Sequence, residues 1–333
     1  KAAGILSGIT STGDYNTVLS QIIPKACQTG HGGVLTPTMW IHNINTLLAR
    51  NIICNKLAPY VNGNPSATIA KSSTSAMSTS DWNNVLTLAG NGIQPGDYIF
   101  SAHSTSASSI FTPTSGNAAA ETTGNNISST FKISVRYIQC FKPADKRLLT
   151  DFRLGSTYNN AFYGTPYNIV DSLQQSANGV YVIGSKQVGQ YEAFITSYEE
   201  NALMLAEANI RTGNIDKGLS YVDAVRTYQG AGVPAVSGTG LTLAQAMQEL
   251  TNESRVALVF RGLSFYNSRR WGWIYDISNG GGQYGQKLYN TNGTYFTNVT
   301  IDYNFMDYWD IPADETTLNA PGTGSAPILN PNY

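Results

Sequence analysis

Three glutamates on one expected helix form the first group of residues that could carry out acid–base chemistry. Glycoside hydrolysis uses two carboxylates roughly 5–10 Å apart across a cleft. Glu199, Glu200 and Glu207 belong to this helix, and Glu200 and Glu207 lie on one face, two turns apart. Because that face must also pack, we expect these glutamates to form ion pairs inside the scaffold.

A second group, Asp307 and Asp310, flanks Tyr308-Trp309 and offers the better candidates for hydrolysis. Carboxylates beside aromatic rings are also what a sugar-binding site needs, so both interpretations stay open. The serine-nucleophile elbow G-x-S-x-G does not occur in the sequence, and three histidines leave a catalytic triad few possible bases. We therefore expect no catalytic residue and a protein that is not an enzyme.

Scattered cysteines and histidines could be drawn as a zinc site. Cys27, His31, His42 and Cys54 do not have the spacing of a compact set of ligand pairs, so we expect no metal. Together with Cys140 the chain has three cysteines, an odd and sparse set that is no disulfide framework. One bridge with a free thiol and three buried thiols both stay open.

A glycine pattern, Gly280-x-Gly282-x-x-Gly285, matches the dinucleotide-binding fingerprint. That fingerprint should follow a strand and begin a helix. The residues after Gly285 are rich in turn formers instead, so we interpret this stretch as a loop and expect no cofactor.

The composition is polar but weakly charged. Of 333 residues, 41% are hydrophobic and 12% are charged, with a formal net charge of −1. The charged share is about half the usual ~25%. Because no strongly basic face is expected, nucleic-acid binding through counterion release is disfavoured, and neutral hydroxyl-rich ligands suit the surface better. The sequence has no run of about 18 apolar residues that would predict a membrane-spanning helix.

Repeated turns indicate how such residues are positioned. Thr12-Gly13-Asp14-Tyr15 and Thr212-Gly213-Asn214-Ile215 each precede an apolar-periodic stretch, and Ser80-Asp81-Trp82 is a looser third copy. We interpret each as the inner turn of a helix-turn-helix unit, in which Gly or Ser ends one helix and Asp or Asn caps the next. The predicted fold class is mostly α, a tetratricopeptide-like helix-turn-helix repeat scaffold with loop-rich and short β insertions.

Three segments carry the helical signal most clearly. Residues 37–58 have apolar steps of three and four, and we expect Pro37 to begin this helix and Pro59 to stop it. Residues 195–208 are apolar on two faces, as in a helix packed between neighbours. Thr242-x-x-Gln245 is a capping box for a helix expected to continue through Leu263.

The domain prediction is one domain over residues 1–333. It comprises helical repeats (1–100), a loop-rich insertion (101–191), a helical repeat with a long helix (192–275), and a C-terminal region of loops and hairpins (276–333).

The segment Glu253–Gly272 contains ESRVALVFRGLSFYNSRRWG. It fits without a gap the helix of roughly E-R-R-x-E-L-x-F-E-G-x-R-F-F-D-L-R-R-W-G that is typical of the SusD/RagB family. Tyr198–Ala208 is similar to the family's Y-x-E-x-x-L-x-x-A-E-A helix. Tyr308–Pro312 and Leu329–Tyr333 are similar to its I-P and N-P-G-Y endings. The chain therefore resembles this family in order over most of its length.

Four positions depart from the family's helix, which usually has Glu, Glu, Arg and Asp there: Ala257, Arg261, Ser264 and Asn267. Such residues are typical partners in buried charge networks, so their joint replacement indicates local rewiring rather than another fold. We interpret Arg255, Arg269 and Arg270 as structural.

The resemblance implies a SusD-like protein that binds oligosaccharide, or peptide, without altering it. Family members lie on the extracellular face of the outer membrane of Bacteroidetes-type cells, as lipoproteins, and serve polysaccharide utilisation. They deliver the ligand to a SusC-like TonB-dependent transporter. The family is usually longer at its N-terminus, so a lipid anchor is expected upstream of this chain. Two other classes stay open: a glycoside hydrolase on a helical scaffold and a helical-repeat adaptor that binds proteins.

The ligand site is expected in the segment from Arg153 to Tyr181, because sugars need aromatic platforms beside polar groups. We predict that Tyr158, Tyr163, Tyr167 and Tyr181 contact the ligand. The alternative is that these rings only pack the loop onto the scaffold. The rival location is 278–309, with Tyr284, Tyr289 and Trp309.

Overall fold

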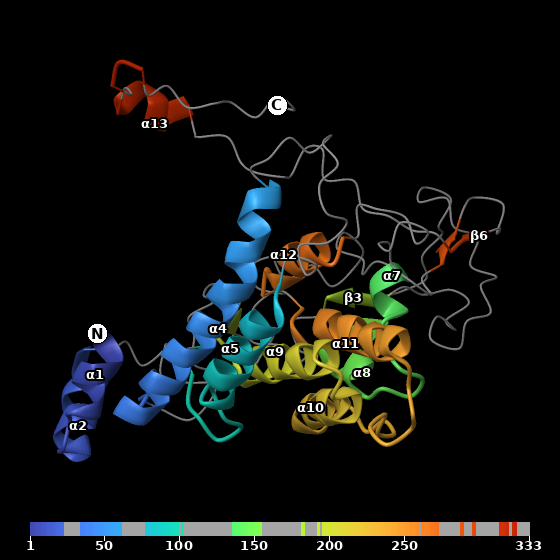
Figure 1. The fold of residues 1–333 in the computed structure, drawn as a ribbon, viewed down its shortest axis with the longest axis horizontal. Coiled ribbons are helices and arrows are strands. Elements are labelled where there is room, and N and C mark those ends of the chain that lie inside the picture. The colour runs from blue at the N-terminus through green and yellow to red at the C-terminus, as the bar shows by residue number, and fades with distance from the viewer. Residues whose placement is uncertain are drawn as a thin grey trace.

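The computed structural model describes residues 1–22, 34–61, 77–99, 101–102, 135–154, 181–183, 192–193, 195–259, 261–272, 287–289, 295–297, 313–319 and 322–324. Most of them are helical, which confirms the predicted mostly α class (Figure 1). Over the described residues, no helix combines the length and the apolar character needed to cross a bilayer. The helices are α1 (Ala2–Ser7), α2 (Thr12–Ile22), α4 (Pro37–Val61), α5 (Thr79–Gly90), α7 (Val135–Ile138), α8 (Arg147–Asp151), α9 (Tyr198–Arg211), α10 (Ile215–Tyr228), α11 (Leu243–Ala257), α12 (Leu263–Arg270) and α13 (Ala313–Leu318).

Short antiparallel strand pairs decorate these helices. β1 (Ser101–Ala102) pairs with β4 (Glu192–Ala193), and β2 (Phe152–Leu154) pairs with β3 (Tyr181–Ile183). β5 (Leu288–Tyr289) pairs with β6 (Tyr295–Phe296), and this pair lies in the C-terminal region.

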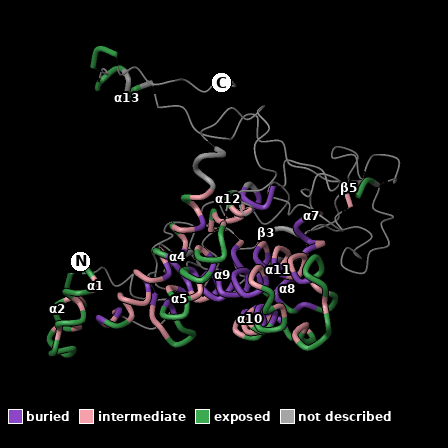
Figure 2. The backbone as a smooth tube through the Cα atoms, in the orientation of Figure 1, coloured by how far each residue is buried: buried purple, intermediate pink, exposed green. Residues whose placement is uncertain are grey.

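Helix α9 is the centre of the scaffold. All of its residues from Glu199 to Ile210 are buried, because α10 and α11 cover one side and α4 and α5 cover the other (Figures 1 and 2). Two apolar clusters join α9 to these neighbours. The first includes Leu203, Ile210, Leu219 and Val222, and the second includes Met204, Ala208, Ile53, Trp82 and Val85. The prediction of a helix packed between neighbours is thus confirmed.

The turn between α9 and α10 is the helix-turn-helix corner that the sequence predicts, but the predicted cap is wrong, because Asn214 lies at the N-cap of α10 without a side-chain capping bond. Gly213 has φ +90°, a conformation that side chains with a Cβ rarely adopt. One turn into α10, Gly218 lies so close to α9 that an added Cβ would meet Ile210 Cγ1 at 2.5 Å and the Ala206 carbonyl at 2.7 Å. The two helices therefore pack closely because glycine occupies their contact.

The two other turn motifs lie inside helices rather than between them. Helix α2 already begins at Thr12, so Gly13 belongs to its first turn. Helix α5 begins at Thr79, and Asp81 forms a capping box with Ser78. A Gly or Asp near a helix start serves the first turn as well as a preceding loop, so the spacing alone misplaced these boundaries.

Two predicted helix ends were also wrong. Helix α4 passes through Pro59 to Val61, since a proline in the last turn removes only one backbone hydrogen bond. Helix α11 is capped by the predicted box at Thr242 but ends at Ala257, and α12 starts separately at Leu263. Gly262, with φ +71°, breaks the expected long helix.

Candidate functional site

Glu199, in the first turn of α9, is fully buried. Its Oε1 accepts hydrogen bonds from Arg261 Nη2 at 3.2 Å and from Gln229 Nε2 at 3.0 Å. Burial by itself would raise the pKa of this carboxyl, but the charge and hydrogen bonds of Arg261, with help from Gln229, lower it to about 2. Glu199 therefore stays ionised and paired.

Glu207 lies two turns further along α9 and is also buried. Arg270 donates to both of its oxygens, and Trp271 Nε1 donates to Oε1 at 3.1 Å. The guanidinium of Arg270 also lies over the Trp271 ring, 4.9 Å from its centroid. Burial would raise the pKa of Glu207, but Arg270, Arg211 and Trp271 together lower it.

Glu200 lies on the side of α9 that faces α4. The Nε and Nη2 of Arg50 both donate to its carboxylate, and Nη2 also donates to the Ile195 carbonyl at 2.8 Å. Burial would lower the pKa of Arg50, but the bonds and the charge of Glu200 raise it overall. This bidentate pair joins α4 to the N-terminal end of α9.

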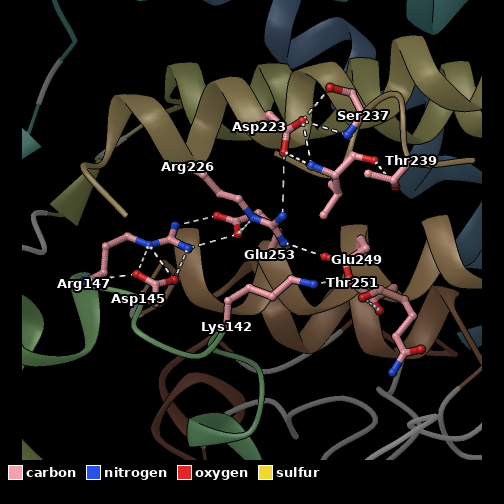
Figure 3. A network of polar contacts seen from close by, with 12 residues as sticks. Lys142, Asp145, Arg147, Asp223, Arg226, Ser237, Thr239, Glu249, Thr251 and Glu253 are labelled. Carbon is pink, nitrogen blue, oxygen red and sulfur yellow. Dashed lines mark hydrogen bonds and ion pairs between the residues drawn. The ribbon is translucent and has the colours of Figure 1, made fainter. Parts of the chain in front are cut away.

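A second ion network connects α8, α10 and α11, as Figure 3 shows. Arg147, at the start of α8, has a side chain that is only 3% exposed. It donates to both oxygens of Glu253 and of Asp145, and its Nη1 donates to Gln229 at 3.0 Å. Burial would lower the pKa of Arg147, yet the two carboxylates raise it overall.

The network continues from Glu253 to the surface (Figure 3). Arg226 Nε donates to Glu253 at 2.9 Å, and Arg226 Nη2 donates to Glu249 at 2.8 Å. Glu249 also pairs with the partly exposed Lys142. Charge therefore alternates in sign along the chain of contacts, as a buried ionic network requires.

These carboxylates are poorly suited to hydrolysis. A glycosidase acid needs a raised pKa and access to the glycosidic oxygen. Glu199 and Glu207 have lowered pKa values, are buried, and are bonded to arginines. They hold the scaffold together, as the sequence predicts for the glutamates of this helix.

The segment with the predicted ligand tyrosines is closed at its base by two nested strand pairs. β1 and β4 bracket residues 103–191, and inside them β2 and β3 bracket residues 155–180. Tyr181 is the first residue of β3 and pairs with Leu154. Tyr158, Tyr163 and Tyr167 lie outside the described residues, as do Tyr284 and Trp309 at the rival location, so their role stays a prediction.

Residues 135–154 fix the inner pair to the scaffold. Helix α8 ends at Asp151, and β2 begins at the next residue. On one side Arg147 binds Glu253, and on the other side apolar residues pack against Val256 of α11: Tyr137, Ile138, Cys140, Phe141 and Leu148. The inner strand pair therefore starts from a helix that is held by both charge and apolar contact.

Other sequence candidates are not brought together in the described part of the chain. His42 lies beside Asp97, with Nδ1 2.7 Å from Oδ2, while Cys54 and Cys140 are free thiols. Within the described residues, no three His, Cys, Asp or Glu side chains are placed to hold a metal ion. Cys27, His31, Asp307, Asp310 and the glycines from 280 to 285 lie outside those residues.

Sequence reasoning missed the residues of the second network. Asp145, Arg147 and Arg226 belong to no motif that we singled out. The available signal was the cluster Lys142–Arg147, which holds four charged residues in a chain with only 12% charge. Such a local excess can indicate an internal network, although it does not name the partners.

Comparison with known proteins gives structural neighbours alone. No family model and no curated protein matches the chain. A solved SusD superfamily protein from Parabacteroides distasonis ATCC 8503 is similar at 14% identity and a TM-score of 0.46, over 88% of this chain. Another, from Bacteroides vulgatus ATCC 8482, is similar at 14% identity and a TM-score of 0.37, over 78% of this chain. This chain spans 63% and 56% of their lengths, and both neighbours belong to the superfamily that the sequence resembles.

Proposed function

We propose that this chain is a non-catalytic binding protein that takes up oligosaccharide at the outer face of the outer membrane. The observation that carries the proposal is the base of the tyrosine-rich segment. β2 and β3 bracket residues 155–180, and α8 fixes β2 to the rigid scaffold. Binding residues are commonly carried on loops that a rigid scaffold positions.

The motif residues support binding over hydrolysis. Glu199, Glu207 and Arg270 belong to the segments that resemble the SusD/RagB family, and in this chain they pair with one another or with other scaffold residues. A site for neutral sugars must then be built mostly from aromatic rings and amides, which the low charge of the chain favours.

The proposed site comprises Tyr158, Tyr163, Tyr167 and Tyr181, within one domain that spans the chain. A glycan array probed with the purified chain would identify the ligand. Calorimetry would then compare each Tyr→Ala variant with Tyr266→Ala, which removes a half-exposed ring of α12 outside the segment. A true platform should lose roughly 1–3 kcal/mol of binding free energy, whereas the control should lose none.

Two outcomes would change the proposal. If all four variants keep the affinity of the unmodified chain, the site moves to the segment 278–309. If incubation with the array ligand releases new reducing ends, the protein is a glycoside hydrolase rather than a binding protein.

We further propose that the chain delivers its ligand to a SusC-like TonB-dependent transporter. A stable pair of this kind should bury roughly 1,200 Å² or more. Extraction of native membranes in mild detergent should therefore recover the chain together with a large transporter. Repeated recovery with a soluble protein instead would favour the helical-repeat adaptor.

A further inference from the structure

One face of α4 carries polar residues at helical spacing. His42, Thr46 and Arg50 follow one another at steps of four, and Asn43 lies beside them. We call these four residues the polar face of α4. Residues at such steps point to the same side of a helix, so a single surface presents all four side chains.

The polar face holds the loop that leads into the 103–191 segment. This loop, residues 91–99, follows α5 and precedes β1. Thr46 Oγ1 accepts from the Ile93 amide at 3.0 Å, and His42 lies 2.7 Å from Asp97. Asp97 Oδ2 also accepts from the Gln94 amide at 2.7 Å, so this carboxylate orders the loop as well as binding α4.

The same face holds the residues that lead out of that segment. Thr196 Oγ1 donates to Asn43 Oδ1 at 2.8 Å, and Arg50 donates to the Ile195 carbonyl at 2.8 Å. Thr46 completes the connection, because its hydroxyl donates to Asn201 Oδ1 of α9 at 3.0 Å. Four side chains of one helix thus contact the two ends of the segment, residues 91–99 and residues 195–196, which lie far apart in the sequence.

The β1–β4 strand pair between these two ends is too short to be stable by itself. β1 and β4 contribute two residues each. An isolated two-stranded pair is marginal in water even at greater length. The contacts with α4 therefore add to those of α9, whose Asn201 donates to the Ile93 carbonyl at 3.2 Å, in keeping Ser101–Ala102 next to Glu192–Ala193.

We propose that the polar face of α4 is a clamp that holds together the two ends of the 103–191 segment, and that the His42–Asp97 contact is its releasable half. The outgoing end is fixed by Arg50, whose guanidinium also binds buried Glu200. The incoming end depends on a contact whose His42 and Asp97 side chains are 24% and 10% exposed. Arg50 and Glu200 are similarly exposed, at 25% and 7%, but the Arg50 side chain makes three hydrogen bonds where His42 makes one contact. The incoming end should therefore open first while the outgoing end stays on α9.

The clamp proposal rests on the proposed function in one respect, namely that the 103–191 segment carries the ligand-binding residues. Hydrogen–deuterium exchange followed by mass spectrometry tests it without any ligand. Failure of the clamp would therefore leave the proposed function standing, and failure of ligand binding would leave the clamp standing.

The informative variant is Asp97→Asn, compared with Asp14→Asn, an exposed aspartate of α2 that bonds Ser11. Amide exchange over residues 93–102 should rise roughly tenfold in Asp97→Asn, because a hydrogen bond to a charged group is weakened. Exchange over residues 195–201 should stay within about twofold of the control, since α9 keeps its own contacts.

A pair of changes at His42 separates positioning from general loss of stability. His42→Leu should reproduce the faster exchange at residues 93–102. His42→Asn should largely restore protection, because its amide nitrogen takes the place of Nδ1 and can donate to Asp97. The proposal is overturned if exchange over 93–102 is unchanged in Asp97→Asn. It is equally overturned if residues 195–201 accelerate as much as 93–102, or if His42→Asn behaves like His42→Leu.

Discussion

Two polar regions of this molecule hold the same scaffold in different ways. The network around Arg147 and Glu253 is built from ions, and both of these side chains are at most 3% exposed. The polar face of α4 combines neutral hydrogen bonds with the Arg50–Glu200 ion pair and reaches partly exposed groups such as His42. The first joins helix to helix, and the second joins a helix to the two ends of a long segment.

This difference indicates which contacts can be lost one at a time without disrupting the rest. Removing one partner of a buried ion pair leaves a charge without compensation, so the network acts as a unit. A neutral hydrogen bond contributes only about 0.5–1.5 kcal/mol in net terms and can be lost alone. The ionic region should therefore fix the scaffold, while the α4 region can release the loop of residues 91–99.

The largest effect is expected from Arg147→Met. Asp145 and Glu253 would stay buried without their shared partner, which should lower the free energy of unfolding by about 3–5 kcal/mol. Denaturant titration would measure this. The matched control Lys142→Met removes a charge from a side chain that is 34% exposed and should cost roughly 0–1 kcal/mol. Equal losses in the two variants would remove the distinction between buried and peripheral members of the network.

The second-largest effect is expected from low pH, which should reduce the stability that Glu199 contributes. The pKa of Glu199 is about 2 in the folded protein and 4.5 ordinarily. Ionised Glu199 therefore contributes roughly 3 kcal/mol to the free energy of unfolding. This contribution is fully present above about pH 4.5 and is lost as the pH falls toward 2.

Glu199→Gln tests the pH effect. The stability difference between the unmodified protein and this variant should be largest near pH 7 and shrink between pH 4.5 and 2. Urea titrations at several pH values would measure it, with Glu315→Gln on exposed α13 as the control. A difference that stays constant down to pH 2 would contradict the lowered pKa.

Gly92→Ala should disturb the α4 region to an intermediate extent. An added Cβ would lie 2.2 Å from Asn201 Oδ1 and 2.5 Å from Thr46 Oγ1, so buried polar groups would have to move. Overpacking of this kind costs typically about 1–3 kcal/mol. Thermal unfolding would compare it with Gly90→Ala, where the new methyl group has no atom within 4 Å. The idea fails if both variants melt alike.

The smallest effects are expected at the helix caps. Ser78 caps α5, which leads to the loop beside α4, and Thr242 caps α11, which carries Glu253. Replacing either by Ala should cost about 1 kcal/mol. Hydrogen exchange should nevertheless differ, with Ser78→Ala loosening residues 79–99 and Thr242→Ala loosening residues 243–257. Identical exchange maps would indicate that the two regions unfold together.

Local patterns were sufficient to predict part of this fold. The two apolar faces of α9 are visible in the sequence because a helix that packs on both sides must carry apolar residues on both, here beside its buried glutamates and asparagines. The capping box at Thr242 is equally local, since both of its partners lie within four residues. The ion pairing of Glu200 and Glu207 followed from their position on one face that has to pack.

Features that depend on distant partners could not be predicted. Arg147 meets Glu253 across 106 residues, and no spacing in the sequence encodes that distance. The break at Gly262 was missed because a continuous apolar period runs through it, while the actual constraint is the backbone conformation at one residue. For Tyr158, Tyr163, Tyr167 and Tyr181, composition gives a prediction about the ligand site, and only Tyr181 lies among the described residues, at the start of β3.

The pairing of α9 with the segment around α12 has a consequence for how this gene can vary in length. Arg261 binds Glu199 and Arg270 binds Glu207, so α9 and the segment Arg261–Arg270 run in the same direction and are joined by two ion pairs. One residue inserted between Arg261 and Arg270 would turn the second arginine by about 100° around its helix axis and separate it from its carboxylate. Insertions and deletions should thus be rejected between these two arginines, even though single substitutions of the exposed residues there can be accepted.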